Sequence, residues 1–473
     1  LWKFAESACA DVVSFLVSVI LARLLLPTEY GEVSLVNVFI VLANVFVVNG
    51  LGTALIQKKN ADELDFSSVF YANLLLSLVL YGVLWFSAPY IASFYSMPHL
   101  SKVLRVLALK IPIAAVNSIQ NAYVSRKMIF KKFFFATLIG TIISAIVGIY
   151  MAYTGLGVWA LVAQILTNTI IDTIVLFITV KWFPKLIFSF ARLKSLFGYG
   201  WKLLISSLIK TGYGQLTNLM IGKLYSGTDL AYYNRGQRYP DLIVSNVNSS
   251  ISSVLFPAIA KNQDDKERVV AMTRRAMKMS TYVMTPFLVG LAAIGDPFIS
   301  WMLTDKWLPC VPFMRICCIY CALEPIQTAN LQAIRAIGRS DVILKLDIVK
   351  RGSGLLLLLL LMKHGPMGVA VAPVGMSLVA IAVNLGANRK LISYSYKEQF
   401  FDLLPNFIQS LAMGAFVYIT CQFLTKMNVS DSLTVCIGVL LGALFYIGLS
   451  VVTKNECMLY LIDTARNTMK KWK

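Results

Sequence analysis

Eight basic residues lie inside or at the edges of the long apolar runs that dominate this 473-residue chain. They are Arg23, Arg105, Lys110, Lys210, Arg315, Lys345, Lys350 and Arg351. A charge at the centre of a bilayer costs about 2.5–3.5 kcal/mol on insertion scales, so such a side chain must reach the interface, pair with an acid or face water. We expect Arg23 and Arg315, near the ends of their runs, to reach the interface. The other six predict a cavity lined by positive charge.

The acids in the same runs are fewer than the bases. They are Asp11, Asp172, Glu324 and Asp347. Lys350 and Arg351 follow Asp347 by three and four residues, a helical spacing that pairs it with one base and leaves the other partly free. The surplus of positive charge favours an anionic ligand such as phosphate, which Lys meets as a point charge and Arg through paired donors. Asp172 and Glu324 are candidates for ion coupling, although either acid can simply pair with a base.

Uncharged hydrogen-bonding side chains are also frequent in the apolar runs. The stretch "KTGYGQLTN" (210–218) combines Lys210 with several of them, and two glycines loosen the helix there. Amide and hydroxyl groups suit the hydroxyls of a sugar, and the alternative use is hydrogen bonding between helices. The candidate sugar contacts are Tyr213, Gln215, Asn218, Asn117, Gln120, Asn121 and Asn248.

The cysteines and histidines do not predict an enzyme or a metal site. The cluster "CCIYC" (317–321) has no second cysteine pair, and the only histidines, His99 and His364, are distant in sequence. We therefore expect these cysteines to be small packing residues of a helix. The sequence has no phosphate-binding P-loop and no histidine beside a candidate nucleophile. These features predict a protein that is not an enzyme and carries no cofactor or metal.

The composition places the chain in a membrane. Hydrophobic residues make up 58%, charged residues 14%, and the mean hydropathy is +0.71. A spanning helix needs about 20 mostly apolar residues. Fourteen such runs predict an all-α integral membrane protein, with centres near Val17, Phe39, Leu78, Val116, Ile143, Asn168, Leu208, Ser249, Val289, Tyr320, Leu355, Val374, Ala415 and Leu441.

The distribution of Lys and Arg predicts the orientation. With a cytoplasmic N-terminus, 28 of the 43 lie in cytoplasmic segments and seven lie in the opposite loops. This asymmetry follows the positive-inside rule and places both termini in the cytoplasm. The net charge of +20 is then explained by topology and by contact with anionic membrane lipids, and no nucleic-acid partner is expected.

A short internal repeat predicts two lobes. "ARLLLPTEYG" (22–31) aligns without a gap with "GKLYSGTDLA" (222–231), and "KNADE" (59–63) returns as "KNQDD" (261–265). Six predicted spans separate the copies, an even number, so the halves would be parallel repeats around a central cavity that suits transport by rocking. A common turn composition at helix ends is the alternative explanation. The predicted boundaries are an N-terminal six-helix lobe 1–182, an amphipathic cytoplasmic linker 183–202, a C-terminal six-helix lobe 203–392, and two extra helices with a basic tail 393–473.

Six ordered motifs resemble the bacterial polysaccharide transporter family of lipopolysaccharide and exopolysaccharide flippases, within the multidrug/oligosaccharidyl-lipid/polysaccharide superfamily. They are "ARLLLPTEYG" (22–31), "GLGTALIQKKNADELDFSSVFYANLLLS" (50–77), "GVWALVAQ" (157–164), "YYNRGQRYPD" (232–241), "DKWLPCVP" (305–312) and "IGRSD" (337–341). The resemblance implies two six-helix lobes around a V-shaped cavity. Related members often carry an acid where this chain has Asn49 and lack one at Asp172, a departure that bears on ion coupling.

The resemblance implies a flippase of the bacterial inner membrane that moves undecaprenyl-diphosphate-linked oligosaccharide outward, serving surface polysaccharide biosynthesis and partnering with the polymerase machinery. The predicted basic cavity would hold the diphosphate and the polar faces the sugars. The alternative is an ion-coupled exporter of drugs or metabolites with the same fold, although a cavity for cationic drugs would be expected to bury acids. A membrane polymerase or acyltransferase would need a large outer loop or a histidine site, and a channel suits the repeat less well.

Overall fold

The structure is a computed structural model that describes residues 2–48, 51–58, 61–129 and 131–463, and the described residues form helices and no strands. The helices of the N-terminal half are α1 (Trp2–Leu24), α2 (Pro27–Val48), α3 (Leu51–Gln57), α4 (Glu63–Phe94), α5 (Leu100–Leu107), α6 (Lys110–Lys127), α7 (Lys131–Tyr153), α8 (Val158–Val180) and α9 (Phe190–Leu224). Those that follow are α10 (Gly227–Ala260), α11 (Lys266–Ala293), α12 (Gly295–Leu303), the 3-10 helix η1 (Asp305–Cys310), α13 (Val311–Ala322), α14 (Glu324–Ala336), α15 (Ser340–Leu361), α16 (Gly365–Ile392), α17 (Tyr396–Lys426) and α18 (Asp431–Val452).

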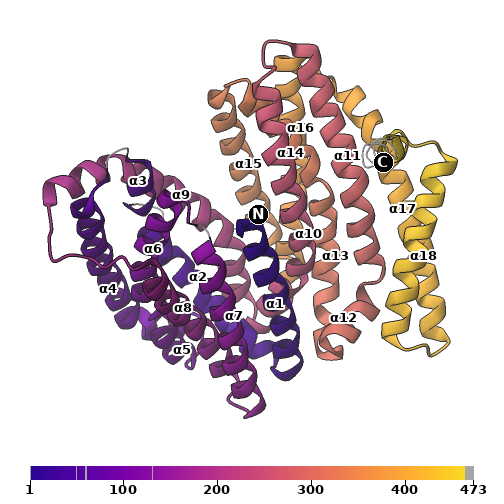
Figure 1. Ribbon diagram of the computed structural model, residues 1–473. Helices are drawn as coiled ribbons and strands as arrows, with labels where there is room; N and C mark the ends of the chain where they lie inside the picture. The colour runs from indigo at the N-terminus through magenta and orange to yellow at the C-terminus, as the bar shows by residue number, and fades with distance from the viewer. Residues whose placement is uncertain (1, 49–50, 59–60, 130, 464–473) are drawn as a thin grey trace, which may run out of the picture. The chain divides into compact units, whose positions relative to one another are not determined.

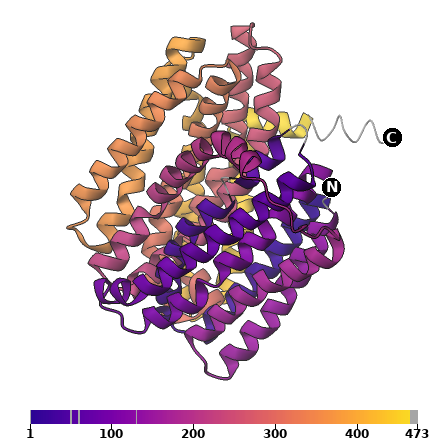
Figure 2. The same ribbon diagram turned by 90° about the vertical axis from the view of Figure 1, so that its left-hand side faces the viewer.

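The helices form two compact units, residues 1–231 and 232–473. In the first unit α7 packs against α1 and α8, α6 against α4 and α8, and α9 against α2, α3 and α4 (Figures 1 and 2). In the second unit α11 packs against α13, α14 and α17, α15 against α16, and α17 against α18. Because α9 contacts three earlier helices, the division between the units falls inside α10, later than the predicted linker. The predicted lobe and linker boundaries stay a prediction.

Every predicted span has its centre inside a helix of the structure. Among the described residues, ten helices or joined helix pairs are long and apolar enough to cross a membrane, and α11 with α12, bent by 74° at their junction, makes an eleventh. The remaining three predicted spans fall on α1, α9 and α15, which are helical but shorter in their apolar part or more polar. An all-α, multi-pass membrane fold is therefore confirmed, and a total of fourteen spans is consistent with the structure.

The two copies of the internal repeat fold in the same way. At the start of α2 the carboxylate of Glu29 accepts the backbone N–H of Leu26 at 2.7 Å. At the start of α10 the carboxylate of Asp229 accepts the backbone N–H of Ser226 at 3.2 Å. Each acid lies three residues after the N–H that it accepts, and a helix N-terminus has unpaired N–H groups that favour such a carboxylate. The aligned positions thus share one capping role, which supports a true repeat.

The second repeated string, "KNADE" and "KNQDD", also ends at helix starts. The Asp62 side chain accepts the backbone N–H of Asp65 at 2.9 Å, and Asp65 returns a bond from the backbone N–H of Asp62, which makes a capping box for α4. Asp265 caps α11 by accepting the N–H of Arg268 at 3.0 Å. At the start of α4, the hydrogen bond that the Asp62 carboxylate accepts from the Asp65 N–H lowers the pKa of Asp62 below its ordinary value, and the nearby Arg192 guanidinium lowers it further.

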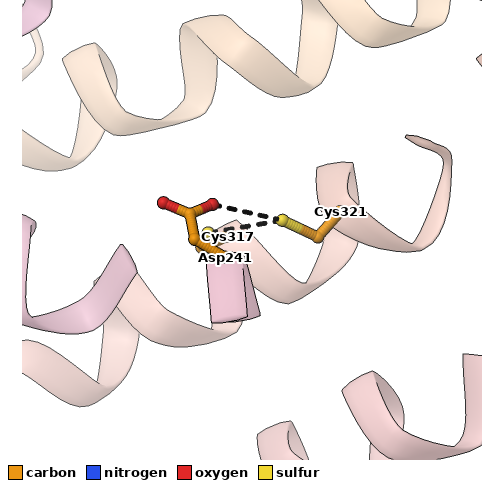
Figure 3. Close-up of side chains that lie close together, drawn as sticks. All are labelled: Asp241, Cys317 and Cys321. Atoms are coloured by element: carbon orange, nitrogen blue, oxygen red, sulfur yellow. Dashed lines mark hydrogen bonds between the residues drawn. The ribbon is translucent and has the colours of Figure 1, made fainter. Parts of the chain in front are cut away.

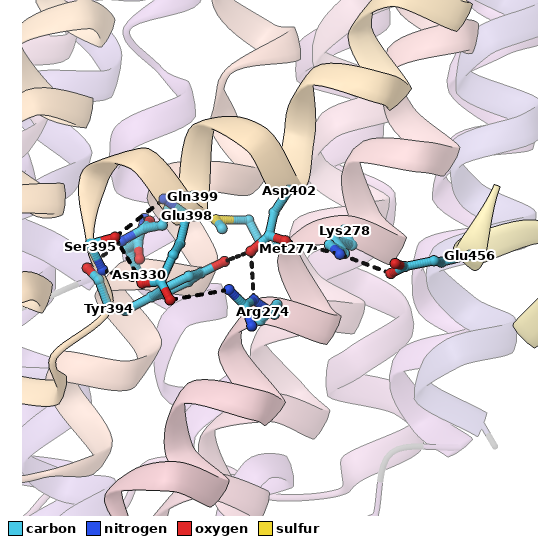
Figure 4. A network of polar contacts seen from close by, with 10 residues as sticks. All are labelled: Arg274, Met277, Lys278, Asn330, Tyr394, Ser395, Glu398, Gln399, Asp402 and Glu456. Carbon is cyan, nitrogen blue, oxygen red and sulfur yellow. Dashed lines mark hydrogen bonds and ion pairs between the residues drawn. The ribbon is translucent and has the colours of Figure 1, made fainter.

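A network of ion pairs joins α17 to α11 in the second unit (Figure 4). Asp402 receives Arg274 Nε at 2.5 Å, Lys278 Nζ at 2.9 Å and the Tyr394 hydroxyl at 2.6 Å. Lys278 also reaches Glu456, beyond α18, at 2.9 Å. Since one carboxylate neutralises two bases and accepts a phenol, the network fastens the two C-terminal helices to the rest of the unit.

Candidate functional site

A polar pocket lies inside the first unit, between α6 and the segment formed by α2 and α3. Its volume is about 230 Å³. The lining residues are Val48, Gly52, Thr53, Ile56, Ala114, Asn117, Ser118, Asn121, Ala122 and Ser125. A site that encloses a drug-sized molecule measures about 300–1,000 Å³, so this pocket can hold one part of a long substrate.

The polar wall of the pocket is one face of α6. Asn117, Asn121 and Ser125 follow one another at intervals of four residues, the spacing that places side chains above one another on a helix. Thr53 of α3 adds a hydroxyl, and no lining residue is charged. The side-chain oxygen of Asn117 is buried and accepts no hydrogen bond from the described residues. A buried acceptor without a donor costs free energy, and a ligand hydroxyl can supply that donor.

Two polar residues fix the walls of this pocket. Arg126, at the end of α6, donates one guanidinium nitrogen to the carbonyl oxygens of Leu55 and Lys58, and so it satisfies the C-terminal end of α3. Asn73 of α4 donates to the Val47 carbonyl at 3.1 Å and to the Ser118 hydroxyl at 3.4 Å. These bonds tie α2, α3 and α4 to α6. The pocket is therefore held by backbone groups that would otherwise lack partners.

Buried charge lies beside the start of α4, near its capping box. Asp65 is fully buried, and both of its carboxylate oxygens accept Lys58 Nζ at 2.6 Å. Arg192 of α9 lies 3.8 Å from the same carboxylate. Further bonds from the segment before α9 run to α4, where Ser67 and Ser68 accept the backbone N–H groups of Lys185 and Ser189 at 3.1 and 2.9 Å. The segment that the sequence predicted as a linker is thus pinned along α4.

The predicted sugar contacts divide among four surroundings. Asn117 and Asn121 line the pocket. Gln120 does not, because it is fully buried and donates to the Trp182 carbonyl at 2.8 Å. Asn218 donates to Gln215 at 2.9 Å within α9. Tyr213 is partly buried on the same helix, and Asn248 of α10 has a buried side-chain oxygen without a partner in the described chain.

The predicted basic residues of the first unit differ in what they contact. Arg105 donates Nε to the Trp85 carbonyl at 3.2 Å, and its guanidinium carbon lies 4.9 Å from the centre of the Trp85 ring. Lys110 is partly buried at the start of α6. Lys210 is exposed on α9 and forms no hydrogen bond or ion pair with the described residues of its unit. Among the candidate bases of the first unit, Lys210 therefore has most freedom to meet a ligand.

The other basic candidates lie on α15 in the second unit. Lys345 is exposed, whereas Lys350 and Arg351 are partly buried. Lys350 is attracted by two acids, Asp347 on its own helix and Glu324 at the start of α14, and is repelled more weakly by Arg335. The positive charge of Lys350 is thus offset within the unit. The gathering of both sets of bases about one cavity stays a prediction.

The structure adds an acid that the sequence analysis did not count. Asp241 of α10 interacts electrostatically with Glu324, one of the two ion-coupling candidates. The other candidate, Asp172, lies where α8 packs against α7, and a Cβ added to Gly140 would come within 3.4 Å of its carboxylate. Asp241 is the last residue of the motif "YYNRGQRYPD". In the sequence this motif resembles the polar start of a span, whereas in the structure it belongs to α10, which continues to Ala260. Asn49 lies outside the described residues.

Comparison with known proteins decides the family. The sequence profile of the family described as "Polysaccharide biosynthesis protein" matches residues 20–312, well over half of the chain. The chain belongs to this family. The resemblance carried by the six sequence motifs is thereby confirmed.

A relative and two solved structures resemble this family member over most of its length. The teichuronic acid biosynthesis protein TuaB of Bacillus subtilis (strain 168) is 25% identical over 464 residues, which cover 95% of this chain and 94% of TuaB. The lipid II flippase MurJ, in an inward closed conformation, has a TM-score of 0.76 at 18% identity and covers 96% of this chain and 99% of its own. An inward-facing multidrug resistance MATE family transporter has a TM-score of 0.61 at 16% identity, over 81% and 94% of the two chains. The fold is therefore that of MurJ and the MATE transporters.

Proposed function

We propose that this protein moves undecaprenyl-diphosphate-linked oligosaccharide from the cytoplasmic to the periplasmic leaflet of the bacterial inner membrane by alternating access. The observation that carries the proposal is the uncharged pocket of the first unit with its polar wall on α6, in a chain that belongs to a polysaccharide biosynthesis family. Its amide and hydroxyl groups match sugar hydroxyls in chemistry, and its volume fits one section of an extended glycan. TuaB is named for the biosynthesis of teichuronic acid and MurJ for flipping lipid II, which supports a glycan carried on a lipid.

The bases supply the second half of the proposal. A diphosphate is met best by Lys and Arg, and the candidates are Lys210, Lys350, Arg351, Arg105, Lys110 and Lys345. Lys210, which is exposed and has no hydrogen-bond or ion-pair partner among the residues of its unit that the structure describes, is the first residue to test. The lipid tail would remain in the bilayer while the headgroup crosses. The orientation with both termini in the cytoplasm follows from the excess of Lys and Arg on that side. The polysaccharide polymerase machinery would receive the flipped substrate.

The decisive experiment measures the arrival of sugar at the far leaflet of vesicles. Purified protein is reconstituted into liposomes that contain undecaprenyl-diphosphate disaccharide in the inner leaflet, and a lectin added outside reports the flipped sugar. We expect the N117L/N121L variant to flip about five- to 150-fold more slowly, because two hydrogen-bonding side chains of the pocket are lost, each worth about 0.5–1.5 kcal/mol. The control is Asn246→Leu on α10, since Asn246 is exposed and donates to the Leu242 carbonyl of its own helix at 2.8 Å.

The result separates the proposal from its main rival. If N117L/N121L and N246L both flip at the wild-type rate, the pocket is not part of the glycan path. If wild-type vesicles flip no lipid-linked sugar but accumulate a cationic dye against an ion gradient, the protein is an exporter of the kind that the MATE fold also serves. The expected outcome is sugar transfer without dye accumulation.

A further inference from the structure

Three side chains with metal-ligating atoms meet inside the second unit, away from the polar pocket. Asp241 of α10 faces Cys317 and Cys321 of α13 (Figure 3). The two sulfurs are 3.6 Å apart, and the Cys321 sulfur is 3.9 Å from a carboxylate oxygen of Asp241. The three ligand atoms lie within 4.8 Å of one another, and no other group of His, Cys, Asp and Glu in the described part of the chain meets that condition.

The fold brings these residues together by two local features. Cys317 and Cys321 are four residues apart, so they lie on one face of α13. Gly236 of α10 lies directly against the start of α13, and a Cβ at this position would lie only 2.8 Å from the Cys310 carbonyl oxygen. Because glycine lets the backbones approach, the carboxylate five residues later reaches the thiols. The sequence could not show this, since 80 residues separate Asp241 from Cys321.

The distances suit a tetrahedral ion. With metal–sulfur bonds of about 2.3 Å, two thiolates of a tetrahedral site are about 3.8 Å apart, and a thiolate and a carboxylate oxygen about 3.5 Å apart. The observed 3.6 and 3.9 Å require shifts of a few tenths of an ångström. The third pair, the Cys317 sulfur and the Asp241 carboxylate, lies within 4.8 Å and must close by up to about 1.3 Å on binding. Two thiolates and one carboxylate select thiophilic ions such as Zn²⁺ over Mg²⁺ or Ca²⁺, and they leave a fourth position for water.

The surroundings provide access and orientation. Both thiols are buried, with 1% exposure each, whereas Asp241 is exposed. The Cys317 thiol donates to the Tyr320 hydroxyl at 3.0 Å, and that hydroxyl accepts Gln237 Nε2 at 3.1 Å. Once Cys317 has lost its proton, the Tyr320 hydroxyl would donate to the thiolate, and outer-shell hydrogen bonds of that kind orient metal ligands. The competing explanation is that these thiols form a hydrogen-bonded cluster that serves only helix packing.

The geometry points to a binding site for one thiophilic divalent cation at Asp241, Cys317 and Cys321. On binding, both thiols lose their protons to solvent, the ion gives up water, two metal–sulfur bonds and one metal–oxygen bond form, and one water stays on the ion. Such a site would clamp α10 to α13 within the second unit. It goes beyond the proposed flipping activity, and it replaces the expectation that the cysteines of "CCIYC" serve packing only.

Cobalt is the probe, because tetrahedral thiolate ligation gives Co²⁺ a charge-transfer absorption that oxygen ligands do not give. The full chain, without a polyhistidine tag, is titrated with Co²⁺ in detergent after reduction. We expect one Co²⁺ per chain and a thiolate band that Zn²⁺ displaces. C317S/C321S should lose the band, and Asp241→Asn should bind at least about tenfold more weakly, since even outer-shell changes cost 10–100-fold.

The matched control is Cys318→Ser. Cys318 is on the same helix, is buried to 3% exposure and is not one of the three ligands, so C318S should keep the band and the affinity. A second readout is thermal: Zn²⁺ should raise the Tm of the wild type and of C318S, but not that of C317S/C321S. Absence of a thiolate band in the well-folded wild type, or equal binding by C317S/C321S, would overturn the site. Sugar transfer in liposomes is measured separately, so failure here leaves the proposed function standing.

Discussion

Gly31 of α2 and Gly227 of α10 lie in direct backbone contact in the first unit. A Cβ placed on Gly31 would overlap the carbonyl oxygen of Gly227. Both residues belong to the internal repeat, in which Gly31 aligns with Ala231 and Gly227 with Pro27. The two copies of the repeat are therefore in contact as well as similar in sequence. The turn between α1 and α2 packs against the turn between α9 and α10.

This contact predicts that Gly31→Ala destabilises the protein. The methyl group has no room beside the Gly227 carbonyl, and overpacking of this kind costs about 1–3 kcal/mol. The control is Gly82→Ala on α4, since a Cβ at Gly82 meets nothing within 4 Å and alanine favours a helix. Thermal unfolding in detergent measures both variants. Equal Tm values for the two would mean that the corners separate freely.

The capping carboxylate of α4 predicts a dependence on pH. The pKa of Asp62 is lowered chiefly by the hydrogen bond from the Asp65 N–H, so the folded state favours the charged form. The resulting stabilisation is present above the unfolded pKa, near 3.9, and is lost as pH falls through the lower folded pKa. At pH 7 we expect Asp62→Asn, which keeps the acceptor, to lose about 0.3–1 kcal/mol of charge stabilisation at the helix N-terminus.

The test is a comparison of three proteins over pH. Asp62→Ala, which removes the cap, should be about 1 kcal/mol less stable than Asp62→Asn at every pH. The advantage of the wild type over Asp62→Asn should shrink below about pH 4. Unfolding followed by tryptophan fluorescence between pH 3 and 7 gives both differences. A constant gap between wild type and Asp62→Asn would show that the charge of Asp62 contributes nothing.

The fold could be predicted from the sequence because each helix is determined by nearby residues. A run of apolar residues long enough for a bilayer predicts a span wherever it occurs, and all the predicted centres fall in helices. The helix starts are local too, since Glu29 and Asp229 cap helices within three residues of themselves. Where a span is interrupted, as at the 74° bend between α11 and α12, hydropathy alone gave no signal.

The candidate site could be predicted from the sequence only in part, because its geometry depends on segments that are distant in sequence. Asn117 and Gln120 look alike in sequence and lie only about 60° apart around α6, yet one side chain lines the pocket and the other donates to the Trp182 carbonyl. The pocket itself requires α3 to fold against α6 through Arg126, 71 residues from Leu55. Neither relation has a signal in the periodicity of α6 alone. The grouping of Asp241 with Cys317 is hidden for the same reason.

Lys210 carries the sharpest prediction for transport. It is exposed in the middle of α9 and has no hydrogen-bond or ion-pair partner among the described residues of its unit, so its removal leaves no buried group unsatisfied there. Lys210→Ala should therefore keep the wild-type Tm while flipping of undecaprenyl-diphosphate disaccharide falls about ten- to hundredfold, the loss expected for a hydrogen bond to a charged group worth about 1.5–3 kcal/mol. Lys210→Arg keeps the charge and should recover much of the rate. By contrast, Lys350→Ala should lower the Tm as well, because Glu324 and Asp347 lose a base that both acids face. If Lys210→Ala flips the substrate as fast as the wild type, the diphosphate is held elsewhere, and the basic lining inferred from charge in the spans does not include α9.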